Sequence, residues 1–406
     1  MMDIYVGRQA ILNIAKETVG YELLYRSNSI NVFQGDVGDM EASIQVINNV
    51  FSELGLQEIS SGLPVFINFN RDMLLADLPD LNSTSVVVEI LEDILVDQPV
   101  IEACIRFRKN GFKIALDDFV PNENTCKLLS LASIVKIDWR ATPIEQINAI
   151  CQELQPYRMK LLAEKIETEQ EFREAKDLGF HFFQGFFFER PTILKTTALQ
   201  VLSNSIVEIM ELIQDEDMEF EKLEKVIAKD AALSFKLLKI INSASKALFK
   251  RIESINQALI LLGQKELKRW LTLFVLTQVN SKYPAELMSI AFIRGLFGEK
   301  MAVAAGRASE ASAVFLTGLL SLLDAILRCP MAEVVKGLPL SKTIKDALIH
   351  NKGPIGTYLL MIKAYERAEK EKIKHYGAIL GIETGKVVRC YIDSLRESGV
   401  YLQSLT

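Results

Sequence analysis

Short apolar segments rich in valine, isoleucine and phenylalanine alternate with longer amphipathic segments through the first 195 residues. The short segments have the length of buried β-strands, and the longer ones repeat apolar residues every three or four positions, as helices do. This alternation predicts parallel β/α units. The expected strands are Arg8–Leu12, Tyr21–Tyr25, Val65–Phe69, Val86–Ile90, Lys113–Leu116, Ile134–Ile137, Leu161–Ala163 and Phe182–Phe187.

The first two expected strands are joined by residues 13–16, a connection that is too short for a crossover helix. They should therefore pair as an antiparallel hairpin. The remaining strands can close as a parallel barrel. We therefore expect a modified TIM barrel whose first strand is antiparallel.

After about residue 200, apolar residues recur every three to four positions, and glycine and proline lie mainly between the segments. This pattern predicts an all-helical second half. The junction falls between Pro191 and Leu199, so we expect an α/β domain over residues 1–195 and an all-α domain over residues 196–406. The expected helices include Leu199–Leu212, Phe220–Ala228, Ala231–Ile241, Lys265–Val279 and Ala285–Ala305.

Composition limits the classes of function. The 406 residues are 49% apolar and 24% charged, which is typical of a folded globular protein rather than a disordered one. Lys and Arg number 46 against 52 Asp and Glu, and the net charge of -6 disfavours a nucleic-acid partner. The basic positions Lys265, Lys268 and Arg269 are therefore expected to form a solvated helix face.

No signal for export or membrane insertion is legible. The N-terminus lacks the basic start and apolar run of a secretory signal. The longest uncharged stretch of the second half, residues 311–323, is shorter than the roughly 18 residues that span a bilayer. The five cysteines form no Cys-x-x-Cys pair, so we expect free thiols. These features predict a cytoplasmic protein without a membrane-spanning segment.

Polar and charged residues stand at or near the C-terminal ends of most expected strands. Barrel active sites are assembled at that end, because side chains from separate strands converge there. We therefore expect one polar mouth. Its expected members are Glu22, Asn68, Glu89, Asp117, Asp118, Lys136, Glu164, Glu167 and Gln184.

So many carboxylates in one pocket would repel one another unless cations neutralised them. Their hard oxygen atoms suit Mg²⁺ or Mn²⁺ rather than zinc. Two such ions bridged by one carboxylate form a clamp for phosphodiester hydrolysis, and Asp117-Asp118 at a strand end fits a bridge and a second ligand. The alternative for any one of these residues is that it caps a helix or faces water.

The residues of the expected mouth carry a resemblance to EAL domains, the cyclic di-GMP phosphodiesterases. Glu22-Leu23-Leu24-Tyr25-Arg26 is similar to the Glu-x-Leu-x-Arg signature of that family, and other family motifs occur in the family's order. These motifs are Gln9-Ala10-Ile11, Ile67-Asn68, Glu89-Ile90-Leu91-Glu92, Leu116-Asp117-Asp118-Phe119, Lys136-Ile137-Asp138, Glu164-Lys165-Ile166-Glu167-Thr168 and Gln184-Gly185-Phe186.

The resemblance implies a two-metal site that binds Mg²⁺ or Mn²⁺. Asp117 would be shared between the two ions, and Asp118 and Glu167 would complete the second. The residues implied as ligands of the first ion are Glu22, Asn68, Glu89 and Asp117.

The resemblance also implies a reaction, the hydrolysis of one phosphodiester of cyclic di-GMP to give linear pGpG. Glu164 would occupy the place of the general base, with Lys136 and Gln184 near the attacking water. Arg26 would hold a phosphate of the nucleotide.

The chain departs from the family pattern at two places. After Asp118 the family has a glycine-rich loop, whereas this chain has Val120-Pro121-Asn122-Glu123-Asn124, and Lys165 replaces a family glycine. Because that loop couples dimerisation to metal placement in active members, we expect weak or absent hydrolysis. The rival hypothesis is a protein-interaction scaffold whose barrel no longer handles nucleotide.

The second half resembles an HDOD domain, a helical signalling module related to the HD and HD-GYP hydrolases. Those hydrolases need an adjacent His-Asp pair, but His181, His350 and His375 do not precede an aspartate, so we expect no metal site in this half. It would instead relay to a signalling protein, and a homodimer is a further alternative. The two halves together resemble the EAL–HDOD tandem proteins of bacteria. The landmarks are Lys229-Asp230-Ala231-Ala232-Leu233, Leu237-Leu238, Asn242-Ser243-Ala244, Ile255-Asn256-Gln257-Ala258, Leu261-Leu262-Gly263 and residues 315–324.

Overall fold

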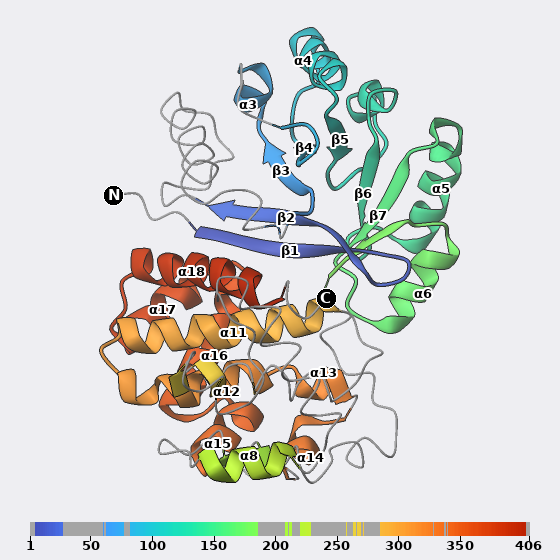
Figure 1. Cartoon of the computed structure of the whole chain (residues 1–406). Coiled ribbons are helices and arrows are strands. Elements are labelled where there is room, and N and C mark those ends of the chain that lie inside the picture. Colours follow the sequence, from blue (N-terminus) through green and yellow to red (C-terminus); the bar gives the residue numbers. More distant parts are fainter. Residues whose placement is uncertain are drawn as a thin grey trace. The chain divides into compact units, whose positions relative to one another are not determined.

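The chain divides into two compact units, which we describe separately in a computed structural model (Figure 1). The first unit contains residues 1–190 with 366–368, and the second contains residues 191–365 with 369–406. The residues that the structure describes are 5–26, 60, 62–76, 82–185, 208–209, 211–212, 220–228, 257, 263–264, 266–268, 271, 285–327, 329–336, 338 and 340–402.

The strands of the first unit close into a barrel in the order of the sequence (Figure 1). Strand β1 runs antiparallel to both of its neighbours, β2 and β8, and the other neighbouring pairs are parallel. The predicted modified TIM barrel with an antiparallel first strand is therefore confirmed. The strands are β1 Tyr5–Asn13, β2 Thr18–Arg26, β3 Val65–Phe69, β4 Val86–Ile90, β5 Lys113–Leu116, β6 Ile134–Asp138, β7 Lys160–Glu164 and β8 Phe182–Gln184.

A tight turn joins β1 to β2. The side-chain oxygen of Asn13 accepts hydrogen bonds from the backbone N–H groups of Ala15 (2.8 Å) and Glu17 (3.0 Å). Lys16 takes a left-handed backbone conformation with φ 62°. These bonds satisfy the turn without a crossover helix, so the two strands pair directly and the predicted hairpin is confirmed.

Helices cover the outside of the barrel, and three of them start at side-chain caps. Asn70 accepts from the N–H of Met73 at the start of α3, and Asp97 accepts from Val100 at the start of α4. Helix α6 begins with a capping box. The helical elements of this unit are α3 Arg71–Leu75, α4 Gln98–Lys109, η1 Thr125–Leu128, α5 Ile144–Leu154, η2 Gln155–Tyr157 and α6 Glu169–Asp177.

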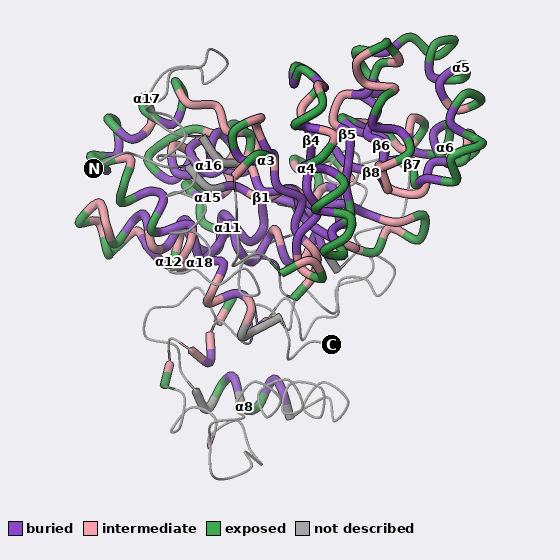
Figure 2. Tube along the Cα trace, turned by 90° about the horizontal axis from the view of Figure 1, so that it is seen from above, coloured by how far each residue is buried: buried purple, intermediate pink, exposed green. Residues whose placement is uncertain are grey.

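The barrel interior holds an apolar cluster to which six strands contribute. Burying each large apolar side chain contributes about 1.5–3 kcal/mol, so this layer fixes the strands against one another. Figure 2 shows the buried character of the strands in the barrel. The members of the cluster are Ile11, Phe66, Val87, Ala115, Ile134 and Leu162.

The second unit is helical wherever the structure describes regular elements in it. Helix α11 packs against both α12 and α18. Gly318 permits the close approach of α12 to α11, because a Cβ there would lie 2.5 Å from the carbonyl oxygen of Arg294. The helices are α8 Phe220–Ala228, α11 Ala285–Ala304, η4 Ala308–Glu310, α12 Ala311–Leu320, α13 Leu323–Leu327, α14 Met331–Lys336, α15 Lys342–His350, α16 Gly353–Glu366, α17 Lys370–Leu380 and α18 Thr384–Leu402.

The predicted helices at 220–228 and 285–305 are confirmed by α8 and α11. The predicted helices at 199–212 and 265–279 fall mostly outside the described residues. The one predicted at 231–241 falls wholly outside them, as do most of the landmarks of the helical half.

The sequence also predicts free thiols and no membrane-spanning segment. Among the described residues, one stretch, Ala308–Ile326, is long and apolar enough to cross a membrane. Its apolar window is 72% buried within the structure, as in a helix that packs in a protein core. All five cysteines are free, as expected.

Candidate active site

A polar layer lies next to the apolar cluster inside the barrel. Alternate residues of a strand point to the same face, so the residue two positions after an inward apolar residue also points inward. In this way Val87 is followed by Glu89, and Ile134 by Lys136. The side chains of this layer are Gln9, Glu22, Asn68, Glu89, Asp117, Lys136, Glu164 and Gln184.

Lys136 lies at the centre of this layer, and only 1% of its side chain is exposed. Its Nζ lies 2.8 Å from Asp117 Oδ1 and 2.7 Å from Glu164 Oε1. It also contacts Glu22 Oε2, at 3.3 Å, and Glu89 Oε1. One ammonium group therefore links carboxylates that come from four different parts of the barrel.

Burial and the neighbouring charges shift the pKa values of these groups. Burial raises the pKa of Glu89 well above its ordinary value; Lys136 opposes this shift, and repulsion from Glu22 and Asp117 reinforces it. Burial likewise raises the pKa of Glu164 well above its ordinary value, against the attraction of Lys136. Burial lowers the pKa of Lys136, but the surrounding carboxylates, Glu164 first, outweigh burial and hold it well above its ordinary value. Among the described residues, the layer therefore sets one ammonium against four carboxylates.

Gln184 and Asn68 orient Glu22. Gln184 Nε2 donates to Glu22 Oε2 at 2.6 Å and to Gln9 Oε1 at 2.9 Å, and Asn68 Nδ2 donates to Glu22 Oε1 at 3.4 Å. Gly185 follows directly with φ 145°, and a Cβ there would lie 2.1 Å from the carbonyl oxygen of Ile166. Only glycine fits at this position, where the end of β8 passes the loop after β7.

A second polar group lies beside the first and contains Asp118, Asp138 and Lys165. Lys165 Nζ contacts Asp138 Oδ2 and lies 3.6 Å from Asp118 Oδ2. Asp138 also accepts from the backbone N–H groups of Arg140 (2.7 Å) and Ala141 (2.9 Å). Burial alone would raise the pKa of Asp138, but the bonds from Lys165 and from these N–H groups lower it.

Glu167 is paired with Arg140. Arg140 Nη2 lies 2.8 Å from Glu167 Oε2 and 3.2 Å from Glu171 Oε1. Among the described residues, two groups of three acids lie close enough to share a cation. The first group is Glu22, Glu89 and Glu164, and the second is Asp117, Asp118 and Glu164. Glu167 belongs to neither group.

The site contains oxygen atoms that suit a hard divalent cation. Glu89 Oε2, Asp118 Oδ1 and Gln184 Oε1 are buried and accept no hydrogen bond from the part of the chain that the structure describes. Such oxygens are costly unless a cation or water engages them. Together with the surplus of carboxylates around Lys136, they fit Mg²⁺ or Mn²⁺. Arg26 lies in β2, but its side chain falls outside the described residues.

The loop after Asp118 is fastened by asparagines. Asn124 accepts from the N–H of Val96 at 2.7 Å and donates to the carbonyl of Ile94 at 2.8 Å. Asn122 accepts from the N–H groups of Asn124 and Thr125. The loop that replaces the family's glycine-rich segment is therefore tied to the connection between β4 and α4.

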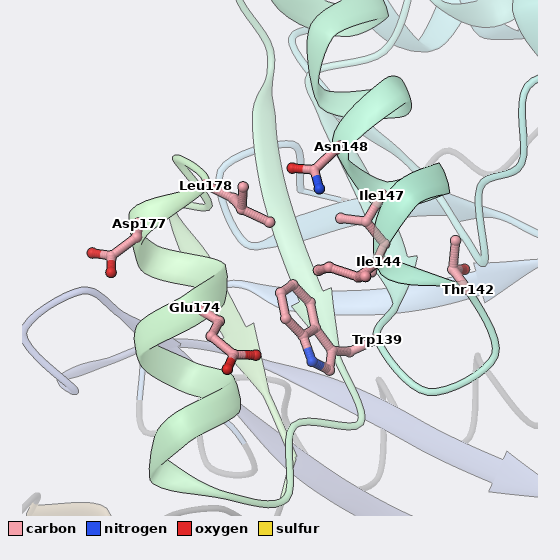
Figure 3. Close-up of a pocket in the computed structure, with 8 residues that line it drawn as sticks. All are labelled: Trp139, Thr142, Ile144, Ile147, Asn148, Glu174, Asp177 and Leu178. Atoms are coloured by element: carbon pink, nitrogen blue, oxygen red, sulfur yellow. The ribbon is translucent and has the colours of Figure 1, made fainter.

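A separate pocket of about 560 Å³ lies outside the barrel, beside α5 and α6 (Figure 3). Trp139 and Ile147 line it, and Glu174 and Asp177 belong to its wall. No member of the polar layer lines it, so it is distinct from the candidate active site.

Sequence patterns missed three residues of these networks. Gln9 was visible in a family motif but was not assigned a role, and Asp138 and Arg140 were not assigned to the site either. Asp138 ends a strand beside Lys136, which is the signal that was available for it. No local pattern pointed to Arg140, because its partner Glu167 lies beyond the next strand.

Comparison with known proteins agrees with the two resemblances seen in the sequence. The EAL domain model matches residues 42–191, and the HDOD domain model matches residues 199–336. The chain is 33% identical to cyclic di-GMP phosphodiesterase CdgJ of Vibrio cholerae, covering 98% of this chain and 93% of that protein. It is 32% identical to YuxH of Bacillus subtilis, covering 97% and 98%. The chain belongs to the family of proteins that join an EAL domain to an HDOD domain.

Solved structures of EAL domains also match the barrel. The Bacillus subtilis YkuI protein, with an EAL domain and in complex with c-di-GMP and calcium, is 22% identical. The match covers 64% of this chain and 73% of that chain, with a TM-score of 0.39.

Proposed function

We propose that the barrel binds Mg²⁺ or Mn²⁺ together with cyclic di-GMP, and that it hydrolyses the nucleotide weakly or not at all. The observation that carries this proposal is the convergence of Glu22, Glu89, Asp117 and Glu164 around one buried ammonium. The near full-length likeness to a protein named as a cyclic di-GMP phosphodiesterase supports the choice of nucleotide.

The proposed ligands of a first ion are the oxygens of the polar layer. When bound, a divalent ion polarises a phosphoryl oxygen and lowers the pKa of a coordinated water. Gln184 and Asn68 keep Glu22 in position for this role through their hydrogen bonds. The proposed set is Glu22, Asn68, Glu89 and Asp117.

Glu164 is the proposed general base. Burial raises the pKa of its carboxyl well above the ordinary value, and a base works best when its pKa lies near the working pH. Lys136 Nζ, 2.7 Å from Glu164 Oε1, stabilises the charged form. Gln184 lies in the same layer and is suited to orient a water, and Arg26 is proposed to hold a phosphate.

We expect the rate to be low because two supports of the site are altered. The loop after Asp118 is tied to the β4 to α4 connection through Asn124, and Lys165 engages acids of the site. Misplacing reacting atoms by about 1 Å can cost on the order of a hundredfold in rate. Turnover to linear pGpG at ordinary enzyme rates by the unmodified chain, lost in Glu164→Gln, would contradict this expectation.

Removal of Asp117 tests the metal site. Asp117 is the proposed shared ligand of the site and lies within cation-sharing distance of Asp118 and Glu164, so Asp117→Ala should abolish Mn²⁺ binding in calorimetric titration. Asp177→Ala, which removes an exposed acid in the last turn of α6, is the matched control and should bind Mn²⁺ as the parent does. Equal affinity of Asp117→Ala and the parent would refute the placement.

The second candidate function is a protein-interaction scaffold. It is favoured by Lys136, which already pairs with the acids that would bind metal, so the layer can also be read as a purely structural ion network. In either case we propose that the helical half recognises a signalling protein and performs no chemistry. Titration of the full chain with Mn²⁺ and then with cyclic di-GMP separates the two functions, because a scaffold binds neither.

A further inference from the structure

The two residues implied as ligands of a second metal ion are each held by a basic side chain of the same chain. Lys165 Nζ lies 3.6 Å from Asp118 Oδ2 and contacts Asp138. Arg140 Nη2 lies 2.8 Å from Glu167 Oε2. In the polar layer, by contrast, Lys136 is the one cationic side chain among the described residues, and it contacts four carboxylates.

Charge therefore differs between the two parts of the site. In the first, four carboxylates surround one ammonium, so a divalent cation finds a surplus of negative charge. In the second, Lys165 pairs with Asp118 and Asp138, and Arg140 pairs with Glu167 and Glu171, so two cationic side chains offset four carboxylates and less negative charge is left than in the first. A divalent ion entering there would have to displace a positive group and would be repelled by it.

The backbone at Lys165 supports the same conclusion. Lys165 follows β7 directly with φ 56°, and Asp118 lies near the end of β5 with φ 38°. Non-glycine residues in the left-handed region are uncommon, and they persist where surrounding contacts compensate the cost. The ion pairs of Lys165 with Asp118 and Asp138 are such contacts.

We propose that the Lys165 ammonium takes the place of the second metal ion, so that the barrel binds one divalent cation per chain. This inference rests on the proposed function, since it assumes that the first group of acids binds metal. It assigns Lys165 as a positioning residue that holds Asp118 in the absence of a second ion.

The experiment counts Mn²⁺ ions in the full chain by calorimetry and by electron paramagnetic resonance. The parent should bind one ion with the spectrum of an isolated Mn²⁺. Lys165→Gly should bind two, with the second at least tenfold tighter than any second ion in the parent, and should show a spin-coupled pair. Glycine is chosen because it accepts the left-handed backbone. Lys160→Ala, at the exposed start of β7, is the control and should still bind one ion.

Asp118→Asn provides an independent check. In the parent background it should leave the count at one, because Asp118 pairs with Lys165 there. Combined with Lys165→Gly it should return the count from two to one. If Lys165→Gly does not fold, Lys165→Asn takes its place, because asparagine also tolerates the left-handed region.

The number of ions bound by the parent shows whether the inference fails alone or together with the proposed function. A parent that binds two ions overturns the inference and leaves the proposed function standing. A parent that binds none overturns both. A folded Lys165→Gly or Lys165→Asn variant that binds only one ion also overturns the inference.

Discussion

At the scale of single residues, Lys136 joins the acids of the polar layer. Its ammonium lies within contact of four carboxylates that are themselves mostly buried. Removing one partner from a buried ionic network leaves uncompensated charge, which is more costly than the network is worth when intact. The positive charge of Lys136 is therefore needed to balance these acids unless another cation is bound.

Lys136→Met should lower the free energy of unfolding by about 3 kcal/mol at pH 8 without metal. The loss should shrink when Mn²⁺ is added, because the ion supplies the missing positive charge. It should also shrink as the pH falls, because Glu89 and Glu164 have raised pKa values and take up protons readily. Urea unfolding measures these changes, and Lys160→Met is the control. If the variant is as stable as the parent, Lys136 does not stabilise the fold by offsetting the charge of these carboxylates.

At the scale of elements, helix starts are tied to one another outside the barrel. Asp97 caps α4 through the N–H of Val100 and also pairs with Arg71 of α3, whose Nη2 lies 2.6 Å from Asp97 Oδ2. The hydrogen bond from Arg71 is the main cause that lowers the pKa of Asp97 below its ordinary value. One carboxylate thus links two helices that follow neighbouring strands.

Asp97→Asn should separate the cap from the ion pair, because asparagine caps as well as aspartate does. A lowered folded-state pKa stabilises the fold above the ordinary pKa of the group, and that stability is lost as the pH falls through the folded value. Asp97→Asn should therefore be less stable than the parent at pH 7, and the difference should disappear as the pH falls through the lowered pKa of Asp97. Thermal unfolding at several pH values measures this, with Asp93→Asn as the control. If the difference in stability between Asp97→Asn and the parent does not depend on pH, the ion pair with Arg71 is not its cause.

At the scale of the whole molecule, the two units have different chemistry. Both groups of acids that could hold a cation lie in the barrel, as far as the described residues extend. The described part of the helical unit is dominated by apolar packing, with α11 between aromatic partners such as Phe315 and Tyr391. We therefore expect metal binding to belong to the barrel.

A fragment from about residue 199 to 406 should fold alone and carry no stoichiometric metal. The reason is that this half contains only two histidines, His350 and His375, and neither precedes an aspartate. Circular dichroism tests folding, and elemental analysis tests metal content beside the full chain. A bound transition metal in the fragment would overturn this expectation. We also expect the fragment to bind any protein partner that the full chain binds. A pull-down in which only the barrel retains partners would contradict this expectation.

The sequence by itself determined the strands of the barrel and the presence of acids at their C-terminal ends. The expected strands Val65–Phe69, Val86–Ile90 and Lys113–Leu116 match the structure residue for residue. Alternation of inward and outward residues is local, so it is legible without the fold. The positions of Glu89 and Asp117 at strand ends follow from the same pattern.

Only the tertiary structure decided which charges meet. Lys136 lies among four carboxylates that are distant in sequence, and no motif indicates these pairs. The pairing of Lys165 with Asp138, and of Arg140 with Glu167, was likewise absent from any motif. Long basic side chains reach across neighbouring strands, and barrel closure selects the acid that each one meets. Sequence spacing does not encode that reach, so the division of the site into two unequal charge groups follows from the fold alone.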